Sequence, residues 1–195
     1  LIIVICIPAS IGIFALAPQI VRLIFGMDFL PCILTLKIFA PFVLISTVGN
    51  LYGTQLLMTF DEEKILFITV SVGALLNMSL NLFLIPKMEQ NGATIASVVT
   101  EAIVLCLQIY FVNKQVKLKC RLHFLKTLFI MTTVMILYLM IIVNFLDDDI
   151  SVIVCSIFGS GCIYLILGIL LKNEAILYFV GLIKSKILSR KKIDV

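Results

Sequence analysis

Apolar residues run along this chain in six stretches, each about as long as a helix that crosses a bilayer. A hydrocarbon core of ~30 Å needs ~20 residues of helix. Lipid offers no partners for backbone N–H and C=O groups, and the stretches are too long for barrel strands, so we expect helices. The predicted spans are Leu1–Ile24, Cys32–Phe60, Ile65–Ile85, Gly92–Val112, Phe124–Phe145 and Ile150–Leu171. This pattern predicts an all-α fold, a polytopic transmembrane helix bundle.

The composition agrees with a membrane protein and argues against an enzyme. Hydrophobic residues make up 62% of the 195 residues and charged residues 13%, with a mean hydropathy of +1.22. A soluble domain of this size has no interior large enough for so much apolar surface. The single histidine, His123, and six cysteines without a CxxC pair give little basis for a metal site or a catalytic triad. We therefore expect no cofactor, no metal and no enzymatic activity.

The basic residues predict an orientation. They gather in the break between Asn113 and Lys126 and in the tail after Lys184. These two segments are two spans apart, so they share a side of the membrane, and short basic loops stay cytoplasmic. Asp147–Asp149 then lies outside. We expect a multi-pass protein of the cell inner (plasma) membrane with a cytoplasmic C-terminus, in contact with membrane lipids and not with nucleic acid.

The two ends of the chain carry further expectations. The first span begins within apolar sequence, with neither Met nor a charged leader, so we expect that Leu1 is not the native start. The chain is then the C-terminal part of a longer protein. In the tail, apolar residues recur at helical spacing opposite basic ones, which predicts either an interfacial helix on anionic lipid or a frayed basic tail. The apolar set is Ile176, Phe179, Val180, Ile183 and Ile187.

Polar residues inside the spans mark the candidate site, because they are costly in hydrocarbon. Glu101 lies near the middle of the fourth span, and Gln108 follows seven residues later on the same helix face. They either line a cavity or form hydrogen bonds to a neighbouring helix. Asn77 and Asn81 share a face of the third span, where amides serve helix–helix hydrogen bonding or, alternatively, contact a substrate.

The first two spans add further candidates. Asn50 and Gln55 belong to a polar patch within the second span. Arg22 and Lys37 lie at the outer ends of the first two spans, where they either snorkel to the interface or line a vestibule that attracts anions. Small residues from Gly92 to Ser97 permit close backbone approach. We therefore expect the third and fourth spans to form a tight antiparallel hairpin across the turn 86–91.

Two segments resemble a known family. Ala17-Pro18-Gln19-Ile20-Val21-Arg22-Leu23-Ile24-Phe25-Gly26 is similar to the "P-x-I-x-x-L-x-F-G" helix ending of oligosaccharide flippases. The stretch from Asn77 through Asn81 and Ile85-Pro86-Lys87 to Gly92-Ala93 and Glu101 resembles their "N-x-x-x-N-x-x-x-IP-K…GA-x-x-A-T-x-x-x-E" hairpin. These are polysaccharide-biosynthesis proteins of the O-antigen flippase type, in the multidrug/oligosaccharidyl-lipid/polysaccharide exporter superfamily. Met88-Glu89-Gln90-Asn91 departs from their usual Tyr-Gly link.

The resemblance covers residues 1–113 and implies one part of a two-lobe exporter fold. Residues 1–113 would form a four-span core, and residues 114–195 a basic loop, two peripheral spans and a basic amphipathic tail. The implied function is translocation of an undecaprenyl-pyrophosphate-linked oligosaccharide across the cytoplasmic membrane for polysaccharide export. The implied partners are this lipid-linked oligosaccharide, the missing N-terminal lobe, and a polysaccharide polymerase and glycosyltransferases.

The resemblance also implies roles for the candidate residues. Asn50, Gln55, Asn77 and Gln108 would replace the hydration of sugars. Arg22 or Lys37 would attract the pyrophosphate, and Glu101 would either couple a proton or cation or anchor its span.

Three other functions stay open at this point. A multidrug or cation antiporter of the same superfamily is separated poorly from a flippase by sequence. A membrane-embedded transferase would need a carboxylate or histidine cluster at one membrane face, and neither Asp147–Asp149 nor the 61–64 turn has a histidine beside it. A non-transporting scaffold is favoured only if Leu1 is a true start.

Overall fold

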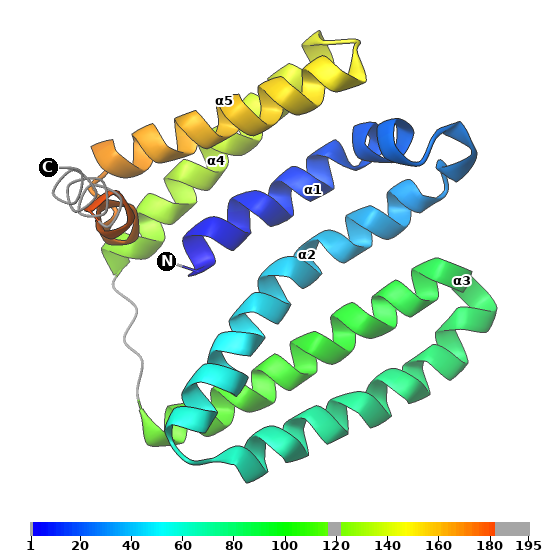
Figure 1. Cartoon of the computed structure of the whole chain (residues 1–195), viewed down its shortest axis with the longest axis vertical. Helices are drawn as coiled ribbons and strands as arrows, with labels where there is room; N and C mark the ends of the chain where they lie inside the picture. The colour runs from blue at the N-terminus through cyan, green and yellow to red at the C-terminus, as the bar shows by residue number, and fades with distance from the viewer. Residues whose placement is uncertain (1, 117–121, 182–195) are drawn as a thin grey trace, which may run out of the picture. The chain divides into compact units, whose positions relative to one another are not determined.

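The structure is a computed structural model and describes residues 2–116 and 122–181. Every regular element in these two ranges is a helix, which confirms the all-α prediction (Figure 1). Five helical stretches in them have the length and apolar composition of membrane spans. The elements are α1 (Ile2–Ile24), η1 (Met27–Phe29), α2 (Cys32–Asn50), η2 (Leu51–Leu57), α3 (Glu63–Gln115), α4 (Leu122–Phe145) and α5 (Asp149–Leu170).

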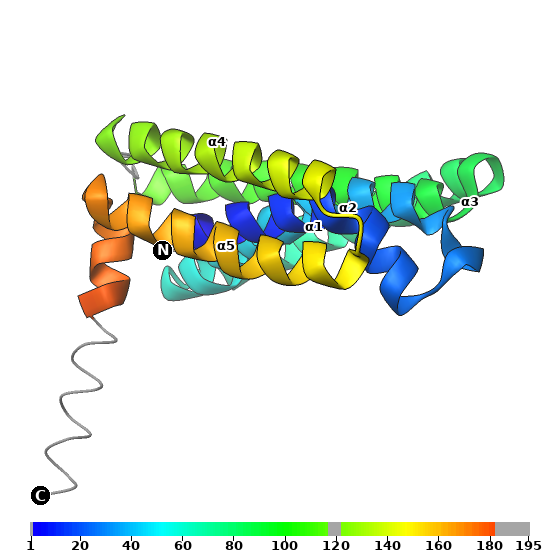
Figure 2. The ribbon, with the colours of Figure 1, turned by 90° about the horizontal axis from the view of Figure 1, so that it is seen from above.

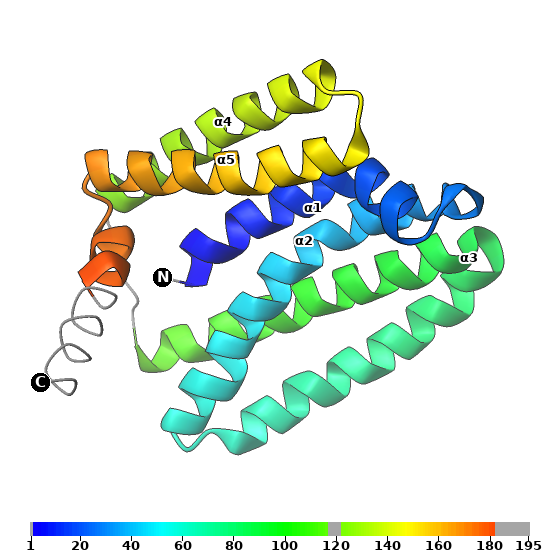
Figure 3. The ribbon, with the colours of Figure 1, turned by 45° about the horizontal axis from the view of Figure 1, so that its top comes forward.

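Helix α3 contains two of the predicted spans and folds back on itself. Its 53 residues are interrupted at Glu89, whose φ of 50° and ψ of −127° are not helical. The two arms on either side run antiparallel (Figures 1 and 3), and at their far ends Gln115 Nε2 donates to Glu62 Oε1 at 2.8 Å. The predicted hairpin is present, but the predicted turn at 86–91 was too long. Pro86 lies inside the helix, and one residue makes the reversal.

The outward faces of the helices are apolar. The phenyl rings of Phe67, Phe129, Phe145 and Phe158 are 73%, 73%, 81% and 71% exposed. So many large exposed apolar side chains would be unfavourable in water but are ordinary against lipid. The length of the helices and their apolar faces together fit a protein that spans a membrane.

The chain divides into two compact units. The α2–α3 unit contains α1 from Ala9 onward, η1, α2, η2 and α3. Within it, Ser10 Oγ donates to the carbonyl oxygen of Ala40 at 2.7 Å, which joins α1 to α2. Thr35 Oγ1 donates to Asn91 Oδ1 at 2.6 Å and ties the beginning of α2 to the reversal of α3. The beginning of α2 is thus held beside the hairpin, and its middle is held to α1.

The α4–α5 unit contains residues 3–8, α4, α5 and the short helix after α5. Helices α4 and α5 run antiparallel (Figure 3). The hydroxyl of Tyr138 donates to the carbonyl oxygen of Cys155 at 3.0 Å. Gly159 makes this contact possible, because a Cβ at that position would overlap the Tyr138 phenol. The glycine therefore allows the ring to lie directly on the backbone of α5.

We predict that Gly92→Ala destabilises the hairpin by about 1–3 kcal/mol, because its methyl group has no room. An added Cβ would lie 2.5 Å from the carbonyl carbon of Leu84 and 3.0 Å from the amide nitrogen of Ile85, in the facing arm. Gly12→Ala is the matched control, since nothing lies within 4 Å of its added Cβ. Thermal unfolding of both purified variants measures the difference, and equal unfolding midpoints would contradict the packing.

We also predict a pH-dependent contribution from Asp148, which caps the N-terminus of α5. The backbone N–H of Ser151 donates to its carboxylate at 2.9 Å and the Ser151 hydroxyl at 2.8 Å, and these bonds lower the pKa of Asp148 below its ordinary value of 3.8. A lowered folded-state pKa contributes stability above the unfolded value, and this is lost as pH falls through the folded value.

Asp148→Ala should therefore lower the unfolding temperature at neutral pH, because the cap is lost. The difference from the wild-type protein should shrink as the pH falls below 3.8. Asp147→Ala, at the exposed neighbouring carboxylate, is the matched control. A difference that does not change with pH would show that the charged cap is not responsible.

Candidate functional site: a polar cleft lined by α2 and α3

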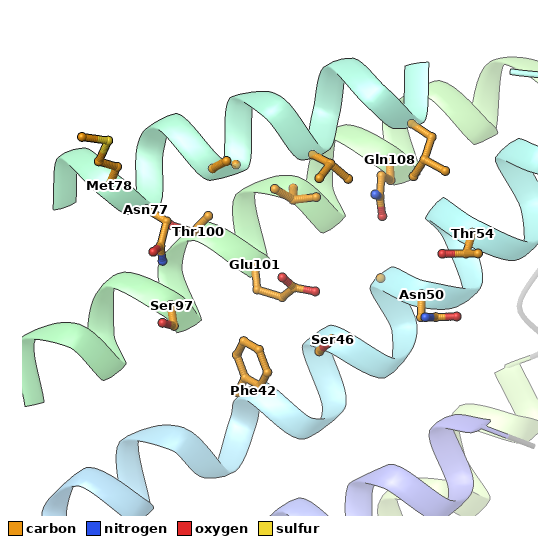
Figure 4. A pocket seen from close by; sticks show the side chains of 16 residues that line it. Phe42, Ser46, Asn50, Thr54, Asn77, Met78, Ser97, Thr100, Glu101 and Gln108 are labelled. Atoms are coloured by element: carbon orange, nitrogen blue, oxygen red, sulfur yellow. The ribbon is translucent and has the colours of Figure 1, made fainter. Parts of the chain in front are cut away.

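A cleft of about 600 Å³ lies within the α2–α3 unit, lined by α2, η2 and both arms of α3 (Figure 4). Half of its lining residues have polar side chains, although each comes from a segment that is otherwise strongly apolar. Among the described residues that line the cleft, Glu101 carries the only formal charge. The polar lining residues are Ser46, Asn50, Thr54, Asn77, Ser97, Thr100, Glu101 and Gln108.

Glu101 and Gln108 enter the cleft from the second arm of α3, facing two glycines. In Figure 4 the Glu101 carboxylate points into the space opposite Phe42 and Ser46 of α2. An added Cβ at Gly49 would lie 3.3 Å from Glu101 Oε1 and 3.9 Å from Gln108 Oε1. The two side-chain oxygens therefore approach one point on the surface of α2, where the lack of a Cβ leaves room for them.

Two buried acceptors in the cleft have no hydrogen-bond partner within the described chain. Gln108 is 4% exposed and Thr100 is 6% exposed, and the oxygens Gln108 Oε1 and Thr100 Oγ1 are both unbonded. Leaving a buried polar group unsatisfied costs about 1–3 kcal/mol, so such groups normally meet water or a ligand. A hydroxyl or amide donor placed in the cleft would satisfy both.

The second predicted span is not one uniform α-helix. From Leu51 to Leu57 the backbone of this predicted helical span forms a π-helix, η2. A π-helix widens the backbone and rotates the side chains that follow it, and short π segments occur frequently at functional sites. Asn50 and Thr54 line the cleft, whereas Gln55 is exposed and lies outside it. Consecutive residues of a helix point in different directions, so the predicted polar patch is divided between the cleft and the exposed side.

The two asparagines of the third predicted span bond to each other. Asn81 Nδ2 donates to Asn77 Oδ1 at 2.8 Å, within the same helix turn. Asn77 lines the cleft, and Asn81 does not. In the predicted pair, one amide therefore faces the cleft and the other orients it. The Asn77 oxygen thus accepts a hydrogen bond from its own helix, whereas a hydrogen bond between helices was expected.

The two predicted basic residues lie away from the cleft. Lys37 is half-buried, with its Nζ 5.7 Å from the centre of the Phe14 ring, a cation–π contact between α2 and α1. Arg22 is half-buried in the last turn of α1. Of the eight predicted site residues, the structure brings together Asn50, Asn77, Glu101 and Gln108, and leaves Asn81, Gln55, Arg22 and Lys37 outside.

Sequence reasoning missed several residues of the cleft. Ser46 and Thr100 were not singled out, because single hydroxyls are common in spans. Their positions in the sequence were the available signal, because Ser46 lies one turn before Asn50 and Thr100 is next to Glu101. Neither Gly49 nor Gly53 was recognised as a partner of Glu101 or Gln108, since a glycine carries no side chain that points to its neighbour.

Comparison with known proteins gives one relative. The chain is 30% identical over 177 residues to an uncharacterized membrane protein of Methanocaldococcus jannaschii. The match covers 88% of this chain and 33% of the relative, so the chain spans about a third of the relative's length. No family model matches the chain, and no solved structure matches it. The name of the relative agrees with the apolar helices described above, and the chain is a helical membrane protein.

We predict that Gly53→Ala acts through Gln108. An added Cβ at Gly53 would lie 2.6 Å from Gln108 Nε2 and 2.9 Å from its Cδ, so the amide must leave its place. Gly53→Ala should destabilise the protein by about 1 kcal/mol, because the displaced group is the end of a flexible side chain that can shift. In a Gln108→Ala background the methyl group has space, so the loss should largely disappear. Denaturant unfolding of the four proteins of this double-mutant cycle measures the coupling, and additive losses would contradict it.

Proposed function

We propose that this chain forms the C-terminal part of a transporter that moves a lipid-linked oligosaccharide from the inner to the outer leaflet of the cell inner membrane. The proposal rests chiefly on the cleft and its two unbonded acceptors, Gln108 Oε1 and Thr100 Oγ1. The resemblance to oligosaccharide flippases supports it independently. No covalent bond is made or broken in this function, which is consistent with a cleft rich in hydroxyls and amides.

The physical difficulty of this transport is moving a polar head through hydrocarbon. Sugar hydroxyls lose their hydration on leaving water and need replacement partners. Asn50, Asn77, Gln108 and Thr100 offer both amide donors and oxygen acceptors. Each hydroxyl of the sugar can donate to an oxygen of the cleft, and the asparagine amides can donate to sugar oxygens. The cleft thus replaces water for part of the head group.

The complete transporter needs a second lobe. Alternating access is commonly achieved when two repeats rock against each other around a central site. In this proposal the partner lobe is supplied by the N-terminal part of a longer protein. In this proposal the C-terminus is cytoplasmic, as the basic loops predict.

A cation antiporter is the second candidate, and Glu101 favours it. A carboxylate within a span is costly unless it serves a pathway, a proton relay or a structural bond. Gln108 Oε1 is the second oxygen close to Gly49, and together the two residues could receive a cation. The two candidates differ in cargo, so one set of variants separates them.

Glu101 provides the test of the proposal. If Glu101 serves translocation, Glu101→Gln in the complete protein should keep the fold but reduce export by on the order of tenfold, equivalent to about 1.4 kcal/mol. Glutamine keeps the shape and hydrogen bonding of the side chain and removes its charge. If Glu101 is structural, Gln should be harmless and Glu101→Leu alone should be damaging. Surface polysaccharide in producing cells, at matched protein level, is the measurement.

A second variant separates cargo from coupling. Gln108→Leu removes a hydrogen-bonding partner of the sugar without changing the charge, so it should also lower surface polysaccharide. Gln55→Leu, on the exposed side of η2, is the matched control. Normal polysaccharide in the Gln108→Leu and Glu101→Gln strains, with loss of tolerance to cationic drugs, would overturn the flippase and favour the antiporter.

A further inference from the structure

The chain turns sharply after α5 and begins a new helix. Leu171 follows the last residue of α5, Lys172 has a φ of 51°, and residues 174–181 are helical. This short helix is turned well away from the axis of α5 (Figure 2, orange to red). The backbone N–H of Asn173 donates to the carbonyl oxygen of Gly168 at 2.9 Å and closes the end of α5. We call residues 174–181 the juxtamembrane helix.

One buried side chain fixes the turn. Asn173 is 1% exposed, and its Nδ2 donates to Thr127 Oγ1 of α4 at 2.8 Å. Its Oδ1 accepts from the backbone N–H of Ala175 at 3.1 Å, and the Thr127 hydroxyl donates to the carbonyl oxygen of Phe124 at 2.9 Å. The first turn of the juxtamembrane helix is thus bonded to the first turns of α4, and its direction does not depend on α5 alone.

The juxtamembrane helix has one packed face and one exposed face, which is mostly apolar but includes Glu174 in its first turn. Ile176 is 2% exposed and lies against Gly168, where any Cβ would overlap its Cδ1. Leu177, Tyr178 and Val180 are 44%, 64% and 37% exposed. These side chains are held at the end of a predicted span, where hydrocarbon meets headgroups. Tyrosine is enriched at that depth because its ring is apolar and its hydroxyl is polar.

We propose that the juxtamembrane helix lies on the bilayer surface and, together with the basic residues that follow it, binds anionic phospholipid headgroups. The fixed turn presents the apolar face, and the charge of the following segment selects the lipid. Residues 182–195 contain one acidic residue, Asp194, against five basic residues. Lysine and arginine close to an apolar helix face favour anionic headgroups. The basic residues are Lys184, Lys186, Arg190, Lys191 and Lys192.

The test places an environment-sensitive fluorophore on the intact protein at Tyr178→Cys, with the native cysteines replaced. The protein is reconstituted in nanodiscs of phosphatidylcholine, or of an equimolar mixture with phosphatidylglycerol. We expect a blue-shifted emission in the mixture, and a smaller shift at high salt because exposed charges are screened. A fluorophore at Asn144→Cys, exposed near the end of α4 and beside the acidic break that is predicted to lie on the opposite side, is the matched control and should not distinguish the lipids.

Two further variants separate the turn from the charge. Asn173→Ala should reduce the blue shift in both lipids, because the helix is no longer held. Lys184→Gln with Lys186→Gln should remove only the part that depends on phosphatidylglycerol. An emission typical of water in both lipids would overturn the proposal. A blue-shifted emission that is independent of lipid and salt would also overturn it, since the helix would then pack on another part of the protein.

Discussion

The membrane interior supplies no hydrogen-bond partners, and this constraint governs the rest of the structure. Backbone groups satisfy it by forming long helices. Side chains satisfy it by gathering: Asn77 binds Asn81, Asn173 binds Thr127, and the Tyr138 hydroxyl binds a backbone carbonyl of the facing helix. Seven buried side-chain oxygens of the described residues have no hydrogen-bond partner, and only those of Gln108 and Thr100 belong to residues that line the cleft. In the proposed transport function, polar groups of the cleft must stay available to the cargo. The general requirement that buried polar groups be hydrogen-bonded within the protein therefore does not apply to them.

Glycine determines where polar side chains can lie between these helices. Gly49 and Gly53 are one turn apart and face Glu101 and Gln108, which are two turns apart on the opposing arm. The methyl group of an alanine at either position would crowd the end of one of these polar side chains, which would have to shift. Gly73 likewise leaves room for Val104, whose Cγ2 would lie 2.5 Å from an added Cβ. Glycines on α2, η2 and the first arm of α3, and larger side chains on the second arm, thus meet at the walls of the cleft.

Much of this architecture follows from sequence, because hydrophobic length is a direct physical signal. The spans and the antiparallel hairpin were predicted from apolar runs, short polar breaks and the small residues from Gly92 onward. The shared face of Glu101 and Gln108 was predictable from helical spacing. The π-helix at Leu51–Leu57 was not, since a short π segment within an apolar span leaves no periodic signature in the sequence. Arg22 and Lys37 were grouped with the site by their charge alone, yet Lys37 instead meets the ring of Phe14.

The reversal of α3 is made by a residue with a side chain, although its backbone geometry favours glycine. Glu89 adopts φ 50° and ψ −127°, a region that glycine enters far more easily than a residue with a side chain. The residues around the reversal, Met88-Glu89-Gln90-Asn91, include no glycine. The additional contact from Thr35 to Asn91 holds the reversal from outside, and Gly92 lets the arms close directly after it. Tertiary contacts around the turn therefore replace the local freedom that a glycine would supply. Because that contact comes from α2, the geometry of the reversal and the position of α2 beside the cleft are fixed together.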